Sequence, residues 1–109
     1  MNSVSLRLGE LREKVPRRIM VGAQPVAVVR IDDEVFAVDD VCSHAEVSLS
    51  EGEVSGCEIE CWLHGSRFDL RTGEPSGPPA IYPVSTYPVT IEGQGDEAVV
   101  LVAVPEEAR

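Results

Sequence analysis

The sequence predicts an all-β protein, an antiparallel β-sandwich or small barrel formed by one domain over residues 1–109. Short runs rich in valine and isoleucine, which fit a pleated sheet, recur along the chain between turn residues. No stretch combines the apolar period of an amphipathic helix with convincing caps. The length of 109 residues and the hydrophobic fraction of 43% suit a single core. Many short strands at this spacing are typical of small barrels and sandwiches.

The elements follow from local patterns. Residues 2–8 alternate polar and apolar side chains, which predicts a short edge strand. Residues 10–14 form one helical turn or a polar loop, and Pro16 ends either. Turn residues at 22–25, 32–34 and 93–96 connect the strands that follow. Those strands are expected at 19–21, 26–31, 35–38, 87–92 and 98–104, and Pro105 stops the last one.

The net charge of −10 and the pI near 4.5 exclude the basic stripe that a nucleic-acid binder needs. The longest apolar run, 98–104, is far shorter than the roughly 20 residues of a membrane helix. No signal-peptide pattern is visible at the N-terminus. We therefore expect a cytoplasmic protein with no membrane partner.

The middle third, residues 41–80, holds all three cysteines and both histidines among several glycines and prolines. It is too polar to be core strand throughout, so it predicts functional loops on the β frame. Cys42 and His44 lie two residues apart, and Cys61 and His64 three apart, so each pair can reach one centre from one tight loop. Thiolate and imidazole together suit zinc or iron.

Two metal sites compete for this pattern. A structural zinc finger pairs cysteine with cysteine and histidine with histidine. Here each loop mixes the two types, as a [2Fe–2S] cluster requires when two histidines replace two cysteines on one iron. The third thiol, Cys57, is expected to pack as a small buried hydrophobe, because an extended 58–60 would hold it about 13 Å from Cys61.

The motif Cys42-x-His44-x₁₆-Cys61-x-x-His64 resembles the ligand signature of Rieske proteins, and the segments at 65–69, 35–40 and 77–79 resemble small bacterial Rieske ferredoxins. The likeness spans residues 17–104. It implies a Rieske-like sandwich with a two-loop cluster-binding subdomain and one [2Fe–2S] cluster. In that likeness Cys42 and Cys61 bind the inner iron, and His44 and His64 bind the exposed one.

The resemblance also implies how the cluster is tuned and covered. Val47 and Leu63 stand where high-potential members carry a disulfide, and Phe68 stands where they carry a tyrosine. Ser66 matches a serine that donates to a bridging sulfide. With fewer hydrogen bonds to sulfur we expect a potential in the low part of the range of about −150 to +300 mV. A proline-rich third loop, with Gly77, Pro78 and Pro79, is expected to cover the cluster.

By the same resemblance the chain is a soluble, monomeric electron carrier. It takes single electrons from a flavin-dependent reductase and passes them to a terminal non-haem iron oxygenase. It has no catalytic site of its own, because no histidine remains for a second iron site. The alternatives are a small Rieske-type subunit of a larger reductase, such as nitrite reductase, and a zinc-stabilised interaction module.

Two surface features bear on the partner. Trp62 and Leu63 lie between two of the expected ligands, where they form either an apolar collar for docking or ordinary packing against the proline loop. Residues 31–60 carry ten acidic and no basic side chains, and this excess surrounds the first cysteine. It serves either solubility or steering toward a basic patch on a redox partner.

Overall fold

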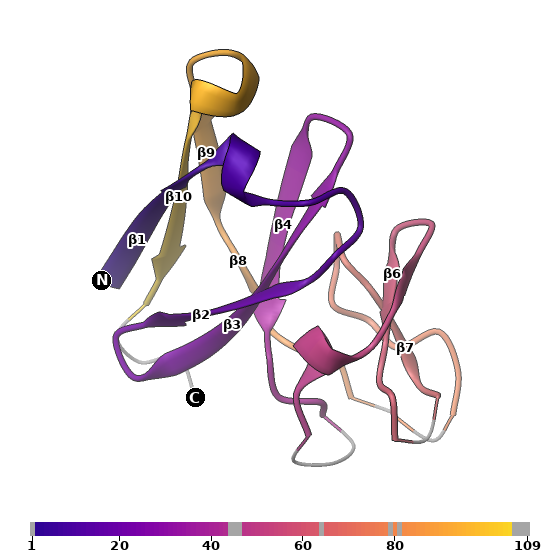
Figure 1. The fold of residues 1–109 in the computed structure, drawn as a ribbon. Coiled ribbons are helices and arrows are strands. Elements are labelled where there is room, and N and C mark those ends of the chain that lie inside the picture. Colours follow the sequence, from indigo (N-terminus) through magenta and orange to yellow (C-terminus); the bar gives the residue numbers. More distant parts are fainter. Residues whose placement is uncertain (1, 44–46, 64, 79, 81, 106–109) are drawn as a thin grey trace.

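A computed structural model describes residues 2–43, 47–63, 65–78, 80 and 82–105, and in this part of the chain all the regular structure is strand or 3₁₀ helix (Figure 1). The all-β prediction is confirmed. The strands are β1 (Asn2–Arg7), β2 (Arg17–Val21), β3 (Gln24–Ile31), β4 (Glu34–Asp39), β5 (Val54–Ser55), β6 (Glu58–Glu60), β7 (Arg67–Asp69), β8 (Thr86–Tyr87), β9 (Val89–Glu92) and β10 (Val99–Val104). The 3₁₀ helices are η1 (Leu8–Glu10), η2 (Leu49–Glu51) and η3 (Gly95–Glu97).

The strands form three antiparallel sheets, with the orders β1-β10-β9, β2-β3-β4-β8 and β5-β6-β7. In Figure 1 the four-stranded sheet lies between the other two. Its central hairpin joins β3 to β4 through Asp32 and Asp33, with Ile31 opposite Glu34. Asp32 has a φ of 55°, a left-handed conformation that aspartate tolerates and that a two-residue hairpin turn favours.

Strand β3 belongs to two cores at once. Val26 and Val28 pack into a core shared with β1 and β10, whereas Ala27 and Val29 pack into a second core beside the small sheet. All four side chains are fully buried. Both faces of β3 are therefore covered, which explains why the sequence reads there as a continuous apolar run rather than an alternation.

The C-terminal half departs from expectation at one residue. The predicted strand at 87–92 is divided at Pro88 into β8, which joins the four-stranded sheet, and β9, which joins β10. Proline has no N–H for a sheet ladder, so the chain changes sheets at that point.

The middle third of the chain, predicted as loops, also contains paired strands. Strands β5, β6 and β7 form a small sheet, with Ile59 opposite both Val54 and Phe68. This sheet carries the segment that holds Cys61, so it is the frame of the predicted two-loop subdomain. Within the described residues, no helix is long and apolar enough to cross a membrane.

Candidate metal centre

The first cysteine loop begins where β4 ends. The Cys42 N–H donates to the Val47 carbonyl at 3.0 Å, and Val41 and Ser48 form an antiparallel bridge. These contacts bring the two ends of the loop together, as in a hairpin. Cys42 is buried. His44 lies outside the described residues.

The second cysteine loop connects β6 to β7. The Cys61 N–H donates to the Ser66 carbonyl at 2.7 Å, and the Gly65 N–H donates to the Cys61 carbonyl at 3.0 Å. Gly65 has a φ of 78°, which a residue with a side chain rarely adopts, so glycine allows this turn to close. Cys61 is fully buried. His64 lies outside the described residues.

Both cysteines belong to one apolar cluster, the second core, together with Leu49, Ile59 and Phe68. Two thiols from two separate loops therefore pack into the same core. Among the described residues, no group of three or more His, Cys, Asp and Glu side chains is placed to hold a metal ion. The two histidines of the motif, His44 and His64, lie outside those residues.

A third loop is attached to both cysteine loops. The Ala80 N–H donates to Ser66 Oγ at 3.1 Å, and Ser43 Oγ donates to the Tyr82 carbonyl at 2.5 Å. Ser66 is buried, and since its oxygen accepts from Ala80, its own proton remains to be donated. The proline-rich segment with Gly77 and Pro78 therefore runs beside the cysteine loops, whereas Pro79 lies outside the described residues.

Phe68, the residue expected to tune the cluster, is fully buried in the second core opposite Ile59. Its ring offers no hydroxyl to a neighbouring sulfur.

Apolar side chains are exposed at the second loop. Trp62 is 50% exposed and Leu63 is 41% exposed. Tyr82, which the first loop contacts through Ser43, is 67% exposed. This exposure favours the apolar collar over ordinary packing against the proline loop.

Cys57 has a different environment from the other two thiols. It is only partly buried against the second core, and the Leu70 N–H donates to its carbonyl at 2.9 Å. Burial raises the pKa of its thiol, so Cys57 stays protonated at neutral pH. The prediction of a small packed side chain is confirmed in part, because Cys57 is half-buried rather than fully buried.

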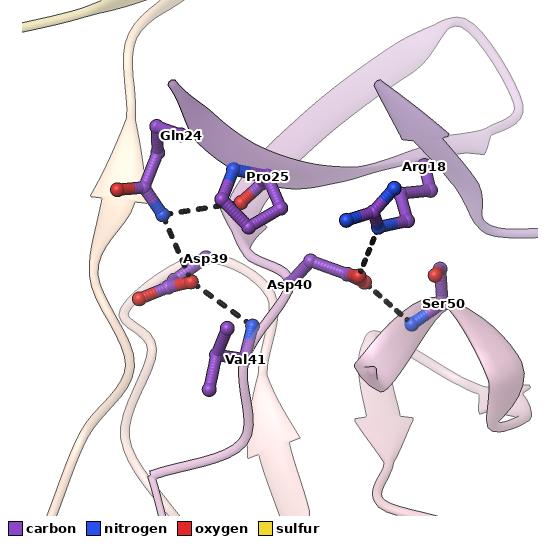
Figure 2. A network of polar contacts seen from close by, with 7 residues as sticks. All are labelled: Arg18, Gln24, Pro25, Asp39, Asp40, Val41 and Ser50. Carbon is purple, nitrogen blue, oxygen red and sulfur yellow. Dashed lines mark hydrogen bonds and ion pairs between the residues drawn. The ribbon is translucent and has the colours of Figure 1, made fainter. Parts of the chain in front are cut away.

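Sequence reasoning did not single out Asp39, the last residue of β4, or Asp40, which follows it. Both are buried, and Figure 2 shows their polar contacts. Asp39 Oδ1 accepts from Gln24 Nε2 at 3.1 Å and from the Val41 N–H at 2.9 Å. Asp40 accepts from Arg18 and Ser50. The available signal was a pair of acids at the end of an apolar strand, with one residue between them and a ligand-type cysteine.

Comparisons with known proteins agree with this geometry. A family model described as the Rieske [2Fe-2S] domain matches residues 3–88. The chain is 44% identical over 88 residues to the anthranilate 1,2-dioxygenase ferredoxin subunit of Burkholderia cepacia, covering 80% of this chain and 82% of that protein.

Two solved structures are also similar. The ferredoxin of carbazole 1,9a-dioxygenase from Nocardioides aromaticivorans IC177 is 40% identical, with a TM-score of 0.86, over 94% of this chain and 98% of that one. The ferredoxin in a complex of reduced oxygenase and oxidized ferredoxin in carbazole 1,9a-dioxygenase is 34% identical, with a TM-score of 0.78, over 89% and 99%.

The chain belongs to the Rieske [2Fe-2S] family, and the predicted fold class and cofactor are confirmed. The described residues fit such a cluster. Two buried thiols from two loops are ligands of the type that iron–sulfur sites use, and a buried serine hydroxyl lies on the second loop.

Proposed function

We propose that this protein is the ferredoxin component of a multicomponent oxygenase system. It accepts one electron from a flavin-dependent reductase and delivers it to a terminal non-haem iron oxygenase. The observation that carries the proposal is the pair of buried thiols on two loops of a Rieske fold, in a chain similar to dioxygenase ferredoxin subunits along most of its length.

We propose Cys42 and Cys61 as ligands of the inner iron, and His44 and His64 as ligands of the outer iron. The cluster supplies one-electron redox chemistry when bound. The chain holds the two thiols away from water, and Ser66 has a proton to donate on the same loop. The third loop, with Gly77, Pro78 and Pro79, shields the site, and Phe68 packs behind it.

The partner is proposed to dock at the exposed end of the cysteine loops. Trp62 and Leu63 present apolar surface there, directly before the expected ligand His64. A protein with this role needs no catalytic site of its own and works as a cytoplasmic monomer. The chain contains no glycine-rich nucleotide fingerprint, so its electrons are proposed to come from a separate protein, and its likeness to dioxygenase ferredoxins favours a flavin-dependent reductase.

The first experiment is metal and sulfide analysis of protein purified without oxygen. We expect about two irons and two acid-labile sulfides per chain, with a visible absorbance that dithionite bleaches. Zinc without sulfide would overturn the assignment and favour the zinc-stabilised module.

The second experiment tests the acceptor. Photoreduced protein is mixed with an oxidised Rieske oxygenase, such as an anthranilate or carbazole dioxygenase, and reoxidation is followed by stopped-flow absorbance. We expect reoxidation to quicken as the oxygenase concentration rises. If reoxidation is equally slow with and without every oxygenase tried, the ferredoxin role fails even though the cluster is present.

A further inference from the structure

Asp40 is a buried carboxylate, 1% exposed, two residues before Cys42. Burying an ionised carboxylate costs free energy unless it is paired and hydrogen-bonded. Its Oδ2 accepts from Arg18 Nε at 3.1 Å, and its Oδ1 accepts from the Ser50 N–H at 2.8 Å (Figure 2). These partners come from opposite sides, one from β2 and one from η2.

Asp40 also uses its main chain to close the loop. Its N–H donates to the Pro25 carbonyl at 3.1 Å, which anchors it to β3. Its carbonyl accepts from the Leu49 N–H at 2.6 Å. With the Ser50 contact, this one residue binds two successive amides on the far end of the Cys42 loop. The position of Cys42 therefore depends on Asp40.

The two side chains of the ion pair differ in their exposure to solvent. The Arg18 side chain is 52% exposed, whereas the Asp40 side chain is 1% exposed. Arg18 lies on β2, the edge strand of the four-stranded sheet, and pairs in register with Ala27 of β3. A single half-exposed arginine thus offsets a carboxylate that is out of water.

We propose that Asp40 is the positioning residue of the first cluster loop and that the Arg18–Asp40 ion pair sets the reduction potential of the protein. This inference rests on the proposed cluster site. Two residues of chain span at most about 7 Å, so the Asp40 backbone is close to the Cys42 ligand. Because the carboxylate is buried, its field is screened less than that of a surface charge.

The sign of the effect follows from charge. Reduction adds a negative charge near Cys42, which an uncompensated Asp40 carboxylate opposes and an uncompensated Arg18 guanidinium favours. Arg18→Met therefore lowers the potential and Asp40→Asn raises it. The double variant returns toward the parent value. Loss of loop packing alone does not predict opposite signs for the two halves of one pair.

The chain offers a matched control. Arg17 immediately precedes Arg18 on β2 and pairs with Glu10 at 3.4 Å, but both side chains of this pair are 46% exposed. Arg17→Met removes the same charge from the same strand where water screens it. We expect its potential to stay near that of the parent.

The experiment is a redox titration of the cluster-loaded parent, the single variants Arg17→Met, Arg18→Met, Arg18→Lys and Asp40→Asn, and the double variant of Arg18→Met with Asp40→Asn. At the parent midpoint, we expect the ratio of reduced to oxidised protein to fall several-fold in Arg18→Met. It should recover in Arg18→Lys, which keeps the cation, and rise in Asp40→Asn. The rate of cluster loss to a chelator reports loop positioning, and we expect it to rise in both Arg18→Met and Asp40→Asn.

Each of the remaining outcomes would contradict one particular part of the proposals. A parent without a [2Fe–2S] cluster overturns the proposed function. A loaded parent whose Arg18→Met and Arg17→Met variants shift equally overturns the role of the ion pair. Potential shifts of the same sign in Arg18→Met and Asp40→Asn also overturn the role of the ion pair. If Asp40→Asn does not fold, the comparison of Arg18→Met with Arg18→Lys decides the question.

Discussion

At the scale of single residues, the three cysteines differ in burial, and the difference agrees with the proposed ligand set. Cys42 and Cys61 are buried in one core at the ends of β4 and β6, whereas Cys57 is half-buried and has a raised thiol pKa. The sequence motif assigns ligand spacing only to Cys42 and Cys61, which are the two cysteines that the structure buries.

Replacing cysteines by serine tests the division. Cys61→Ser removes a sulfur ligand, and we expect the purified variant to lose most of its iron and sulfide. Cys57→Ser is the matched control and should keep the parent content, because its thiol is protonated and lies off the site. Iron and acid-labile sulfide per chain measure both. A Cys57→Ser protein without cluster would contradict the assignment.

Ser66→Ala tests the hydroxyl of the second loop. The change leaves the Ala80 N–H without its acceptor, at a cost of about 1–3 kcal/mol. It also removes the proton that Ser66 has available for sulfur. We therefore expect a lower thermal midpoint and a lower reduction potential.

Ser43→Ala is the control for Ser66→Ala, because it breaks the other attachment of the third loop, to the Tyr82 carbonyl. It should loosen the loop and leave the potential near the parent value. Equal shifts of potential in both variants would show that loop attachment, rather than the Ser66 proton, is responsible.

At the scale of elements, close approach of backbones holds the small sheet in place. A Cβ atom on Gly52, just after η2, would overlap the Glu60 carbonyl oxygen on β6. The φ of Gly52 is −91°, which any residue adopts, so glycine is needed here for space and not for conformation. Strand β6 ends at Glu60 and leads directly into Cys61, so this contact also supports the second cysteine loop.

Gly52→Ala should lower the free energy of unfolding by about 1–3 kcal/mol, because backbone must move to admit the methyl group. Gly77→Ala is the matched control for stability, because its methyl group would meet nothing within 4 Å. Its effect should stay within about 0.5 kcal/mol. Thermal unfolding followed by circular dichroism measures both, and equal losses would contradict the steric account.

The strands show what a sequence can predict. The long strands β3, β4 and β10 were predicted within one or two residues, because runs of valine and isoleucine mark them directly. Strands β5, β6 and β7 are two or three residues long and carry glutamates and arginine, so their strand structure comes from pairing with each other. Local propensity carries no signal of that kind.

The same reason explains which site residues were missed. The spacing of Cys42 and Cys61 with their histidines is a local pattern, and it identified both loops. Arg18 and Asp40 are 22 residues apart and meet only because β2 pairs with β3. A contact created by sheet register cannot be read from either residue's neighbours.

At the scale of the whole molecule, the acidic segment 31–60 is less charged at its surface than its composition indicates. Asp39 and Asp40 are buried. Arg71 lies 3.2 Å from Glu34, and Arg67 lies 3.5 Å from Glu60, so basic groups from outside the segment offset part of it. The charge left to steer a partner is smaller and more local than the sequence count.

Glu51 and Glu53 are exposed and directly follow the first cysteine loop. If they steer the oxygenase, electron transfer should slow as ionic strength rises from low to physiological. The double change Glu51→Gln and Glu53→Gln should lower the rate at low salt and weaken its salt dependence. Stopped-flow reoxidation of the reduced protein measures both.

The control removes two charges far from that loop. Glu92 and Glu97 lie at the end of β9 and in η3, at the opposite end of the molecule from the cysteine loops (Figure 1). Glu92→Gln with Glu97→Gln should leave the rate at low salt near that of the parent. A rate that ignores ionic strength, or equal effects of the two double variants, would rule out steering by the acidic segment.

Strand β3 has one more consequence, for how the molecule comes apart. Its odd-numbered and even-numbered side chains pack into different cores. If either core opens, one face of β3 is exposed while its other face still packs against the second core. The amide protons of β3 should therefore exchange with solvent only through global unfolding, and be among the slowest in the chain. We therefore expect that removing the iron from the cysteine loops speeds amide exchange along β3 and also in β10.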